Sequence, residues 1–434
     1  MDRSATLTDG SHLVTQQSWQ EFTERCDAAS CRSCGQSTLK PVLDLGKMPL
    51  ADGLLNDAQL AEHENRYPLE LAFCSNCALV QILETVPPEI LFGHDYPYFS
   101  SFSDALLAHS RDNALDLIER RNLKPGEGCL VVELASNDGY LLKNFVEKGI
   151  NVLGIDPAPG PAKAAEKIGV PTLCDFFTEN LAGKLANEGK QADVIIANNV
   201  LAHVADTNGF VRGIRTLLKD GGAAVIEVPY VRELIEHGEF DTIYHEHLCY
   251  FSVCALDALF RQNGLFLNDV KTLAIHGGSL RLYVEKHERP SPVILEMLSE
   301  ERALGLDRYE YFKNFSERVL DIRSEMQTLL NDLREQGKTI AGYGAAAKGA
   351  IMLNFIGAGT DVIDYVVDRN VHKQGLHMPG THQPIPDPAR ILQEMPDYVV
   401  ILPWNFKDEI MSQQQEYRDK GGQFIIPIPK PHVV

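Results

Sequence analysis

Residues 130–140 have the sequence LVVELASNDGY, in which a short run of branched apolar residues ends in a small, polar turn. Three further apolar runs follow, at residues 152–155, 194–197 and 223–228, with helical patterns between them. Strands that alternate with helices form parallel sheets with right-handed crossover connections. We therefore predict an α/β domain built on a parallel sheet over residues 91–285.

The turns that follow these strands predict what the domain binds, because open parallel sheets bind ligands beyond the carboxyl ends of their strands. The first turn has one glycine, Gly139, and lacks the GxGxxG pattern that brings a diphosphate onto a helix N-terminus. Its acidic residues, Glu133 and Asp138, disfavour a phosphate and suit a cation. Asp156, after the second strand, can accept hydrogen bonds from both hydroxyls of a ribose.

Asp175 and Phe176 lie at the end of the short segment that follows residues 152–155, and they suit the amino group and the ring face of an adenine. An adenosine that carries a positive charge and no phosphate is S-adenosylmethionine. The strand ends therefore favour a methyltransferase over an NAD-dependent oxidoreductase. The predicted cofactor-binding residues in these turns are Ser136, Asn137, Asp138, Gly139, Asp156, Pro157, Asp175, Phe176 and Asn198.

Four of the nine cysteines form two pairs, Cys31-x-x-Cys34 and Cys74-x-x-Cys77. Two such pairs complete the tetrahedral thiolate shell of a Zn²⁺ ion, whereas a redox site would need only one pair. A site with four thiolates is closed, so it should hold the fold and do no chemistry. We predict a zinc-binding module over residues 26–90, in which residues 44–71 loop out between the two pairs.

Residues 240–252, FDTIYHEHLCYFS, concentrate groups that can move protons. An imidazole titrates near neutral pH, a neighbouring glutamate can orient it, and a tyrosine hydroxyl can stabilise an oxyanion. Tyr244, Glu246 and His247 are therefore candidate acid–base residues, although a metal pair or two ordinary buried histidines would also fit the pattern. Further on, His276 and Arg281 suit an anionic or hydroxylated ligand, or a plain turn with a surface arginine.

The pattern changes after Val284. Apolar residues spaced by three and four from Leu306 to Leu333 predict one long amphipathic helix. Strands are then predicted at residues 339–343, 362–368, 397–402 and 423–428, so residues 286–434 should form a second Rossmann-like unit.

The first turn of this second unit, GYGAAAKG at residues 342–349, is rich in small residues. Small residues let backbone N–H groups approach a phosphate at a helix N-terminus, and Lys348 adds a positive charge. Asn405 follows a later strand and could contact the same ligand. An NAD site is disfavoured because the third glycine of GxGxxG is missing, while plain packing of a degenerate unit stays open.

The composition of the chain excludes several classes of function. The 434 residues include 40 Lys and Arg against 60 Asp and Glu, so no overall positive field attracts nucleic acid or an anionic membrane. No apolar run approaches the roughly 18–20 residues of a membrane-spanning helix. Residues 1–25 lack the pattern of a signal peptide and are predicted to be a flexible polar tail. We therefore expect a cytoplasmic, multidomain protein.

With these features in place, the chain resembles the bacterial sugar C-methyltransferases, which methylate C3 of a nucleotide-linked 4-keto-deoxysugar, the tetronitrose-pathway enzyme among them. The resemblance spans nearly the whole chain after the tail. It is carried by the two cysteine pairs and by LGxxPLA (45–51), DYPYFSS (95–101), SNDG (136–139), IDPA (155–158), NVLAH (199–203), YHEH (244–247), HGGSLR (276–281) and GYGAAAKG (342–349).

The resemblance implies an α/β protein with a small zinc-binding module, a Rossmann-like methyltransferase domain and a Rossmann-like C-terminal domain that binds the sugar nucleotide. The expected nucleotide is dTDP. It adds His203 to the catalytic residues and Tyr98 to the cofactor-binding ones. His247 would remove the C3 proton to give an enolate, with Tyr244 as the alternative base, Glu246 orienting His247 or binding a hydroxyl, and His203 and Tyr244 stabilising the oxyanion. The expected substrate-binding residues are His276, Arg281, Tyr343, Lys348 and Asn405.

The resemblance also leads us to expect a monomer. Two alternatives remain at this point. One is a methyltransferase of the same architecture that acts on another activated ketone. The other is a zinc-ribbon binding protein whose α/β units are vestigial.

Overall fold

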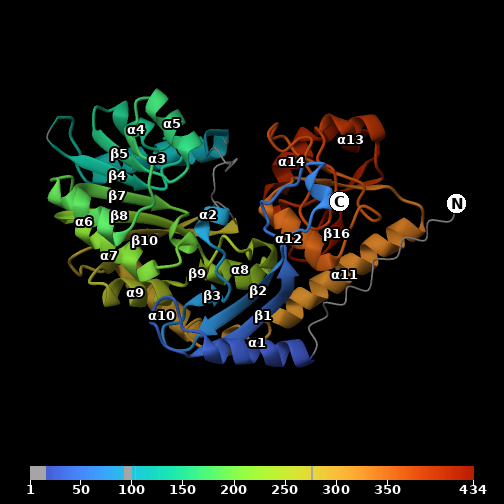
Figure 1. Cartoon of the computed structure of the whole chain (residues 1–434), viewed down its shortest axis with the longest axis horizontal. Helices are drawn as coiled ribbons and strands as arrows, with labels where there is room; N and C mark the ends of the chain where they lie inside the picture. The colour runs from blue at the N-terminus through green and yellow to red at the C-terminus, as the bar shows by residue number, and fades with distance from the viewer. Residues whose placement is uncertain (1–15, 92–99, 103, 127, 275–276) are drawn as a thin grey trace.

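The computed structural model describes residues 16–91, 100–102, 104–126, 128–274 and 277–434. Figure 1 shows two α/β domains side by side, with a small sheet module, drawn in blue, between and below them. The α/β class expected from the alternating pattern is confirmed. Within the described ranges, every helix is too short or too polar to cross a membrane.

The first α/β domain contains a seven-stranded sheet in the order β10-β11-β8-β7-β4-β5-β6. Strands β6, β5, β4, β7 and β8 run parallel, β11 runs antiparallel to β8, and β10 runs antiparallel to β11. The chain winds outward from β4 in one direction and then crosses to β7, which makes the β4/β7 edge the switch point of the sheet. The strands are β4 (Leu130–Leu134), β5 (Asn151–Ile155), β6 (Thr172–Leu173), β7 (Ala192–Asn198), β8 (Leu218–Pro229), β10 (Phe266–Leu273) and β11 (Ser279–Glu285).

Helices cover both faces of this sheet (Figure 1). Several start at a side-chain cap: Thr178, Asp206 and Ser252 each accept a hydrogen bond from a backbone N–H in the first turn. The helices are α3 (Asp104–Arg120), α4 (Lys143–Val146), α5 (Pro159–Lys167), α6 (Glu179–Asn187), α7 (Thr207–Leu217), α8 (Val231–His237) and α9 (Val253–Gln262).

The zinc-binding module is a four-stranded antiparallel sheet in the order β1-β2-β3-β9. Its strands are β1 (Leu39–Met48), β2 (Tyr67–Cys74), β3 (Val80–Ile82) and β9 (Cys249–Tyr250). The prediction that residues 44–71 loop out is wrong at both ends, because they include the ends of the paired strands β1 and β2. Strand β9 comes from the methyltransferase domain, directly after YHEH, so the module and the candidate catalytic segment share one sheet.

Helix α1 (Gln16–Ala28) packs on this sheet, with Phe22 and Cys26 fully buried. Arg25 pairs with Glu70 on β2. The flexible tail predicted for residues 1–25 is therefore wrong for residues 16–25, where the apolar side chains of α1 are used to cover the sheet.

The C-terminal domain is a five-stranded sheet in the order β13-β12-β14-β15-β16. Its strands are β12 (Ile340–Tyr343), β13 (Val366–Val367), β14 (Tyr398–Ile401), β15 (Gln423–Ile426) and β16 (His432–Val433). The strand expected at residues 362–368 is therefore only two residues long. The helices after the first domain's sheet are α10 (Pro292–Leu304), α11 (Phe315–Glu335), α12 (Ala347–Ile356), α13 (Ala389–Glu394), α14 (Lys407–Gln413) and α15 (Gln415–Asp419). Of these, α10 packs on α9 and β10 of the methyltransferase domain (Figure 1).

The long helix expected from Leu306 begins later, at Phe315. The residues before it use their aromatic rings to pack on the zinc-binding module instead. The Tyr309 hydroxyl donates to the carbonyl of Pro41 at 2.8 Å, and the Phe312 ring stacks on Phe73 at 4.8 Å. Helix α11 then runs from this module to the C-terminal domain (Figure 1).

Candidate active site

A cavity of about 750 Å³ opens beyond the carboxyl ends of β4, β5 and β7 and reaches the two neighbouring domains. Seven carboxylate residues line it, and Lys348 is the one lysine or arginine among the described lining residues. A cavity with this balance of charge favours a cationic ligand over an anionic one. The lining carboxylates are Asp52, Glu89, Asp156, Glu179, Asp206, Glu239 and Glu246.

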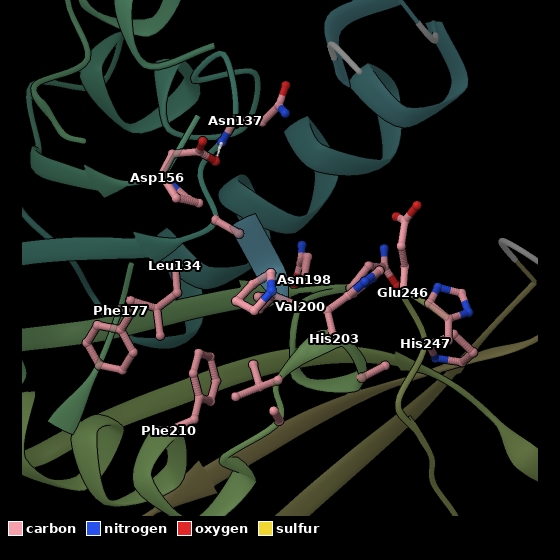
Figure 2. A pocket seen from close by; sticks show the side chains of 18 of the residues that line it. Leu134, Asn137, Asp156, Phe177, Asn198, Val200, His203, Phe210, Glu246 and His247 are labelled. Carbon is pink, nitrogen blue, oxygen red and sulfur yellow. Dashed lines mark hydrogen bonds between the residues drawn. The ribbon is translucent and has the colours of Figure 1, made fainter. Parts of the chain in front are cut away.

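Asp156 bonds to the backbone of two neighbouring turns at one end of the cavity. Its carboxylate accepts hydrogen bonds from the backbone N–H of Asn137 at 2.8 Å and of Ala158 at 2.9 Å (Figure 2). Burial raises the pKa of Asp156, and these two N–H donors oppose the rise. The carboxylate oxygens keep lone pairs toward the cavity side, which suits the two hydroxyls of a ribose.

The backbone at this end is unusually constrained. Ala135, Asn137 and Asn199 all have positive φ, at 56°, 49° and 53°, and all three line the cavity. Non-glycine residues hold such angles only where the surroundings impose them, and they concentrate at functional sites. The strand ends are therefore shaped for a ligand rather than for relaxed turns.

Five of the nine predicted cofactor residues in these turns line the cavity, and four do not. Those that line it are Asn137, Asp156, Pro157, Phe176 and Asn198. Those that do not are Ser136, Asp138, Gly139 and Asp175. A tenth prediction, Tyr98, lies outside the described residues.

The four remaining residues have structural partners that explain their positions. A side chain on Gly154 would meet the Ser136 hydroxyl at 2.4 Å, so Ser136 fills the space over β5. Gly139 has φ of 77° and no room for a Cβ, which would lie 3.1 Å from Val170. Asp138 accepts from the backbone N–H of Ser101, and Asp175 accepts from that of Phe176.

At the other end of the cavity, Tyr244, His247 and His203 form a Tyr–His cluster (Figure 2 shows the two histidines). Nδ1 of His247 lies 3.0 Å from the carbonyl oxygen of Thr242. A carbonyl only accepts, so Nδ1 carries the proton and the neutral ring has its lone pair on Nε2. Nε2 in turn lies 2.9 Å from the Tyr244 hydroxyl, which donates to it. His247 is thus set up as a base at Nε2.

His203 is held neutral beside this base. Its ring meets that of His247 edge-on at 4.8 Å. Burial lowers the pKa of His203 to about 4, against a hydrogen bond to the backbone of Glu246. A neutral imidazole can donate a hydrogen bond without repelling a proton that arrives on His247.

The segment that carries this cluster is clamped by its neighbours. The backbone N–H of Leu248 donates to Ala202 at 2.8 Å, and the carbonyl of Leu248 accepts from Ile82 in the zinc-binding module. Nε2 of His245 donates to the carbonyl of Pro68 at 3.2 Å. His245 is therefore a structural residue, and the YHEH segment is fixed by the zinc-binding module.

The four predicted zinc ligands converge. The Sγ atoms of Cys31, Cys34, Cys74 and Cys77 all lie within 4.8 Å of one another, and two of the pairs are 3.5 and 3.6 Å apart. Zn–S bonds of about 2.3 Å in a tetrahedron place thiolates about 3.8 Å apart. The geometry fits a structural Zn²⁺ site with four thiolates and no open position.

The C-terminal domain meets the cavity at Lys348, on the first turn of α12. Its Nζ lies 4.7 Å from the ring centre of Trp404 and 3.5 Å from Oδ1 of Asn405. Trp404 donates its indole N–H to Asp241 of the first domain at 2.8 Å. Lys348 and Asn405, predicted to act together, are thus brought together at the junction of the two domains.

Two other predicted substrate residues lie elsewhere. Arg281 is only 3% exposed and pairs with Glu227 at 2.7 Å, next to His109. Tyr343 is 4% exposed within the core of the C-terminal domain. Both predictions are corrected, because these side chains are committed to internal packing. His276 lies outside the described residues.

Three family models match the chain along its length. They are a zinc binding domain at residues 31–92, a methyltransferase domain at residues 106–268 and a C-methyltransferase C-terminal domain at residues 274–429. A curated relative, C-methyltransferase NovU from Streptomyces niveus, is 36% identical over 408 residues, which cover 93% of this chain and 96% of NovU.

This chain belongs to the sugar C-methyltransferase family. The protein is an S-adenosylmethionine-dependent methyltransferase with a zinc-binding domain. A second kind of relative matches the middle of the chain alone. The ubiquinone biosynthesis O-methyltransferase of Azorhizobium caulinodans is 28% identical over 127 residues, which cover 28% of this chain and 47% of that protein.

Among the cavity-lining residues of this C-methyltransferase that the sequence did not predict are Asp52, Glu239 and Tyr250. Tyr250 lies in the quoted segment 240–252, six residues after Tyr244, and this position could have made it a candidate site residue. Glu239 directly precedes the segment. Asp52 directly follows LGxxPLA, but no local pattern marks it as part of a site nearly two hundred residues away.

We expect the Asp156→Asn substitution to weaken binding of S-adenosylhomocysteine by about 10- to 100-fold, because hydrogen bonds to a charged acceptor contribute about 1.5–3 kcal/mol. Isothermal titration calorimetry measures the effect. Asp112→Asn, at an exposed position on α3 of the same domain, is the matched control. Equal affinity in the two variants would remove Asp156 from the cofactor site.

Proposed function

We propose that this enzyme transfers a methyl group from S-adenosylmethionine to C3 of a nucleotide-linked 4-keto-deoxysugar, with dTDP as the nucleotide carrier. The observation that carries the proposal is the Tyr–His cluster, in which His247 has its basic Nε2 bonded to the Tyr244 hydroxyl inside the cavity. Methylation of carbon needs a base of this kind, because a C–H bond must give up its proton. A ketone at the neighbouring carbon makes that proton acidic enough to remove.

The bound cofactor supplies an electrophilic methyl group. Nε2 of His247 accepts the C3 proton, directly or by way of the Tyr244 oxygen, and the electron pair of the C–H bond becomes the enolate. His203 donates a hydrogen bond to the C4 oxygen, on which negative charge develops. Once Nε2 of His247 has taken the C3 proton, the Tyr244 hydroxyl can donate its one proton to the same oxygen. C3 would then form its bond to the methyl carbon as the bond between that carbon and sulfur breaks and its electron pair stays on sulfur. The C4 ketone is restored, and the proton stays on His247 until release.

The acidic wall of the cavity supports the placement of the cofactor, since a sulfonium is attracted by carboxylates such as Asp156. The residues that would hold the cofactor are the strand-end residues Asn137, Asp156, Phe176 and Asn198, all of which line the cavity.

For the nucleotide diphosphate we propose the N-terminus of α12. This ten-residue helix begins after Ala346, which provides no side-chain cap, so N–H groups of the first turn are available to an anion. Lys348 stands on the same turn and faces the cavity. The N–H of Ala345 is already used by Asp368 at 2.8 Å, which leaves the following residues as donors.

Lys348→Ala should raise the KM for the nucleotide sugar by about 10- to 100-fold, since a charge-assisted bond to phosphate contributes about 1.5–3 kcal/mol. The kcat should change little, because Lys348 is not part of the Tyr–His cluster. Steady-state kinetics at saturating S-adenosylmethionine would measure both. Lys420→Ala, at a half-exposed position of α15's C-terminal end, is the control. An unchanged KM in Lys348→Ala would refute the anchor.

The proposed function is tested by titrating S-adenosylhomocysteine into the protein and then thymidine diphosphate in its presence. Binding of both ligands supports a methyltransferase with a separate nucleotide-sugar site. Binding of S-adenosylhomocysteine alone would contradict the nucleotide-linked substrate.

A further inference from the structure

The zinc-binding module contributes Asp52 to the cavity wall, in addition to Pro88 and Glu89 near its C-terminal end. Asp52 follows β1 in the segment that connects β1 to β2, and it lines the cavity together with Glu246. The two carboxyl groups are hydrogen-bonded to each other, although they come from different domains. Their contact places a module residue next to the Tyr–His cluster, since Glu246 immediately precedes His247 (Figure 2).

The position of Asp52 is fixed from outside the module. Three residues later, Leu55 exchanges two backbone hydrogen bonds with His377 of the C-terminal domain, at 3.0 and 2.8 Å. Further along the same connection, Glu64 accepts from the backbone N–H of Gly380 at 2.9 Å. The segment that carries Asp52 is therefore held between two domains and does not move freely over the cavity.

Two carboxyl groups in contact share one proton, because two like charges at hydrogen-bond distance repel each other. Burial raises the pKa of Glu246 to about 8, and the negative charge of Asp52 adds to the rise. The positive charge of Lys373, from the C-terminal domain, opposes it. At neutral pH the pair thus offers one O–H donor and several acceptor lone pairs.

We propose that Asp52 and Glu246 form a substrate-binding carboxyl pair, and that this pair takes a hydroxyl group of the sugar ring beside the reacting carbon. A hydroxyl is at once a donor and an acceptor, and the singly protonated pair matches both. Asp52 is then a specificity-determining residue, and the zinc-binding module completes the substrate site. The inference rests on the proposed function and assigns a subsite within it.

The test compares four full-length variants with the wild type: Asp52→Asn, Glu246→Gln, the double variant and Asp57→Asn. Asp57 lies in the same connection with a side chain that is 91% exposed, so Asp57→Asn is the matched control. The substrate is dTDP-4-keto-6-deoxyglucose at saturating S-adenosylmethionine. Zinc content and S-adenosylhomocysteine affinity establish that each variant is folded, and Asp52→Ser replaces Asp52→Asn if the amide disturbs the loop.

We expect Asp52→Asn to raise the KM for the sugar by about 10- to 100-fold, with kcat within about threefold and cofactor affinity unchanged. Because the two carboxyl groups act on one hydroxyl, the double variant should be little worse than the poorer single variant. A KM equal to that of Asp57→Asn, or single effects that multiply in the double variant, would overturn the pair. Failure of the wild type to methylate this substrate would instead contradict the proposed function on which the pair rests.

Discussion

His247→Asn is expected to lower kcat by about 10²- to 10⁴-fold, which is the contribution of a positioned general base. Asparagine fits the space but has no lone pair that can take a proton at neutral pH, so the C3 proton has no acceptor. The affinity for S-adenosylhomocysteine should stay unchanged, because Asp156 and the strand-end residues lie at the other end of the cavity (Figure 2). Single-turnover methyl transfer would measure the rate, and calorimetry the affinity.

The matched control for this variant is His287→Asn, which replaces a histidine whose side chain is 56% exposed. It should retain wild-type turnover. Full turnover of His247→Asn with bound substrate would refute the assignment of the base. A greater loss in Tyr244→Phe than in His247→Asn would transfer the abstraction step to Tyr244, whose hydroxyl lies 2.9 Å from Nε2 of His247.

Removal of zinc is expected to lower methyl transfer about as strongly as His247→Asn does, but for a different reason. Four-thiolate sites contribute about 10–16 kcal/mol to folding, which equals or exceeds the roughly 5–15 kcal/mol by which whole domains are stable. The carbonyls of Arg32 and Ser33, between the first two cysteines, accept hydrogen bonds from Asn208 in α7 at 3.0 and 2.7 Å. Loss of the metal therefore releases contacts of the methyltransferase domain as well.

We accordingly predict that Cys74→Ser, or treatment with a strong chelator, abolishes methyl transfer and lowers the melting temperature. Differential scanning calorimetry, zinc analysis and an activity assay would follow the three quantities together. Cys174→Ser, at an exposed cysteine outside the module, should change none of them. Full activity in a zinc-free protein would show that the module does not support the YHEH segment.

The sheets could be predicted because their strands are buried runs of branched residues. The strand Leu130–Leu134 coincides with the apolar run at the start of residues 130–140, since both faces of it are covered. The helix expected from Leu306 is wrong for its first nine residues, although they have the helical spacing of apolar residues. The spacing of threes and fours is present, but Tyr309 and Phe312 contact the zinc-binding module from a turn, which buries the same side chains as a helix would. The spacing of apolar residues predicts which side chains are buried, but it does not predict which part of the protein they pack against.

The candidate site could be predicted where chemistry and local sequence coincide. Tyr244 and His247 are three residues apart, so one turn of chain brings them together. Arg281 was misplaced because its partner, Glu227, lies on the neighbouring strand, a pairing that depends on sheet order. Asp52 was missed because only the assembly of the module with the methyltransferase domain brings it to Glu246.

The most direct test of the account is transfer of a ¹³C-labelled methyl group from S-adenosylmethionine to dTDP-4-keto-6-deoxyglucose by the wild-type enzyme, followed by NMR of the product. We expect a new methyl carbon bonded to C3, next to the C4 ketone, and no such product from His247→Asn. A methyl group on oxygen, or no transfer to this nucleotide sugar by an enzyme that binds S-adenosylhomocysteine, would contradict it.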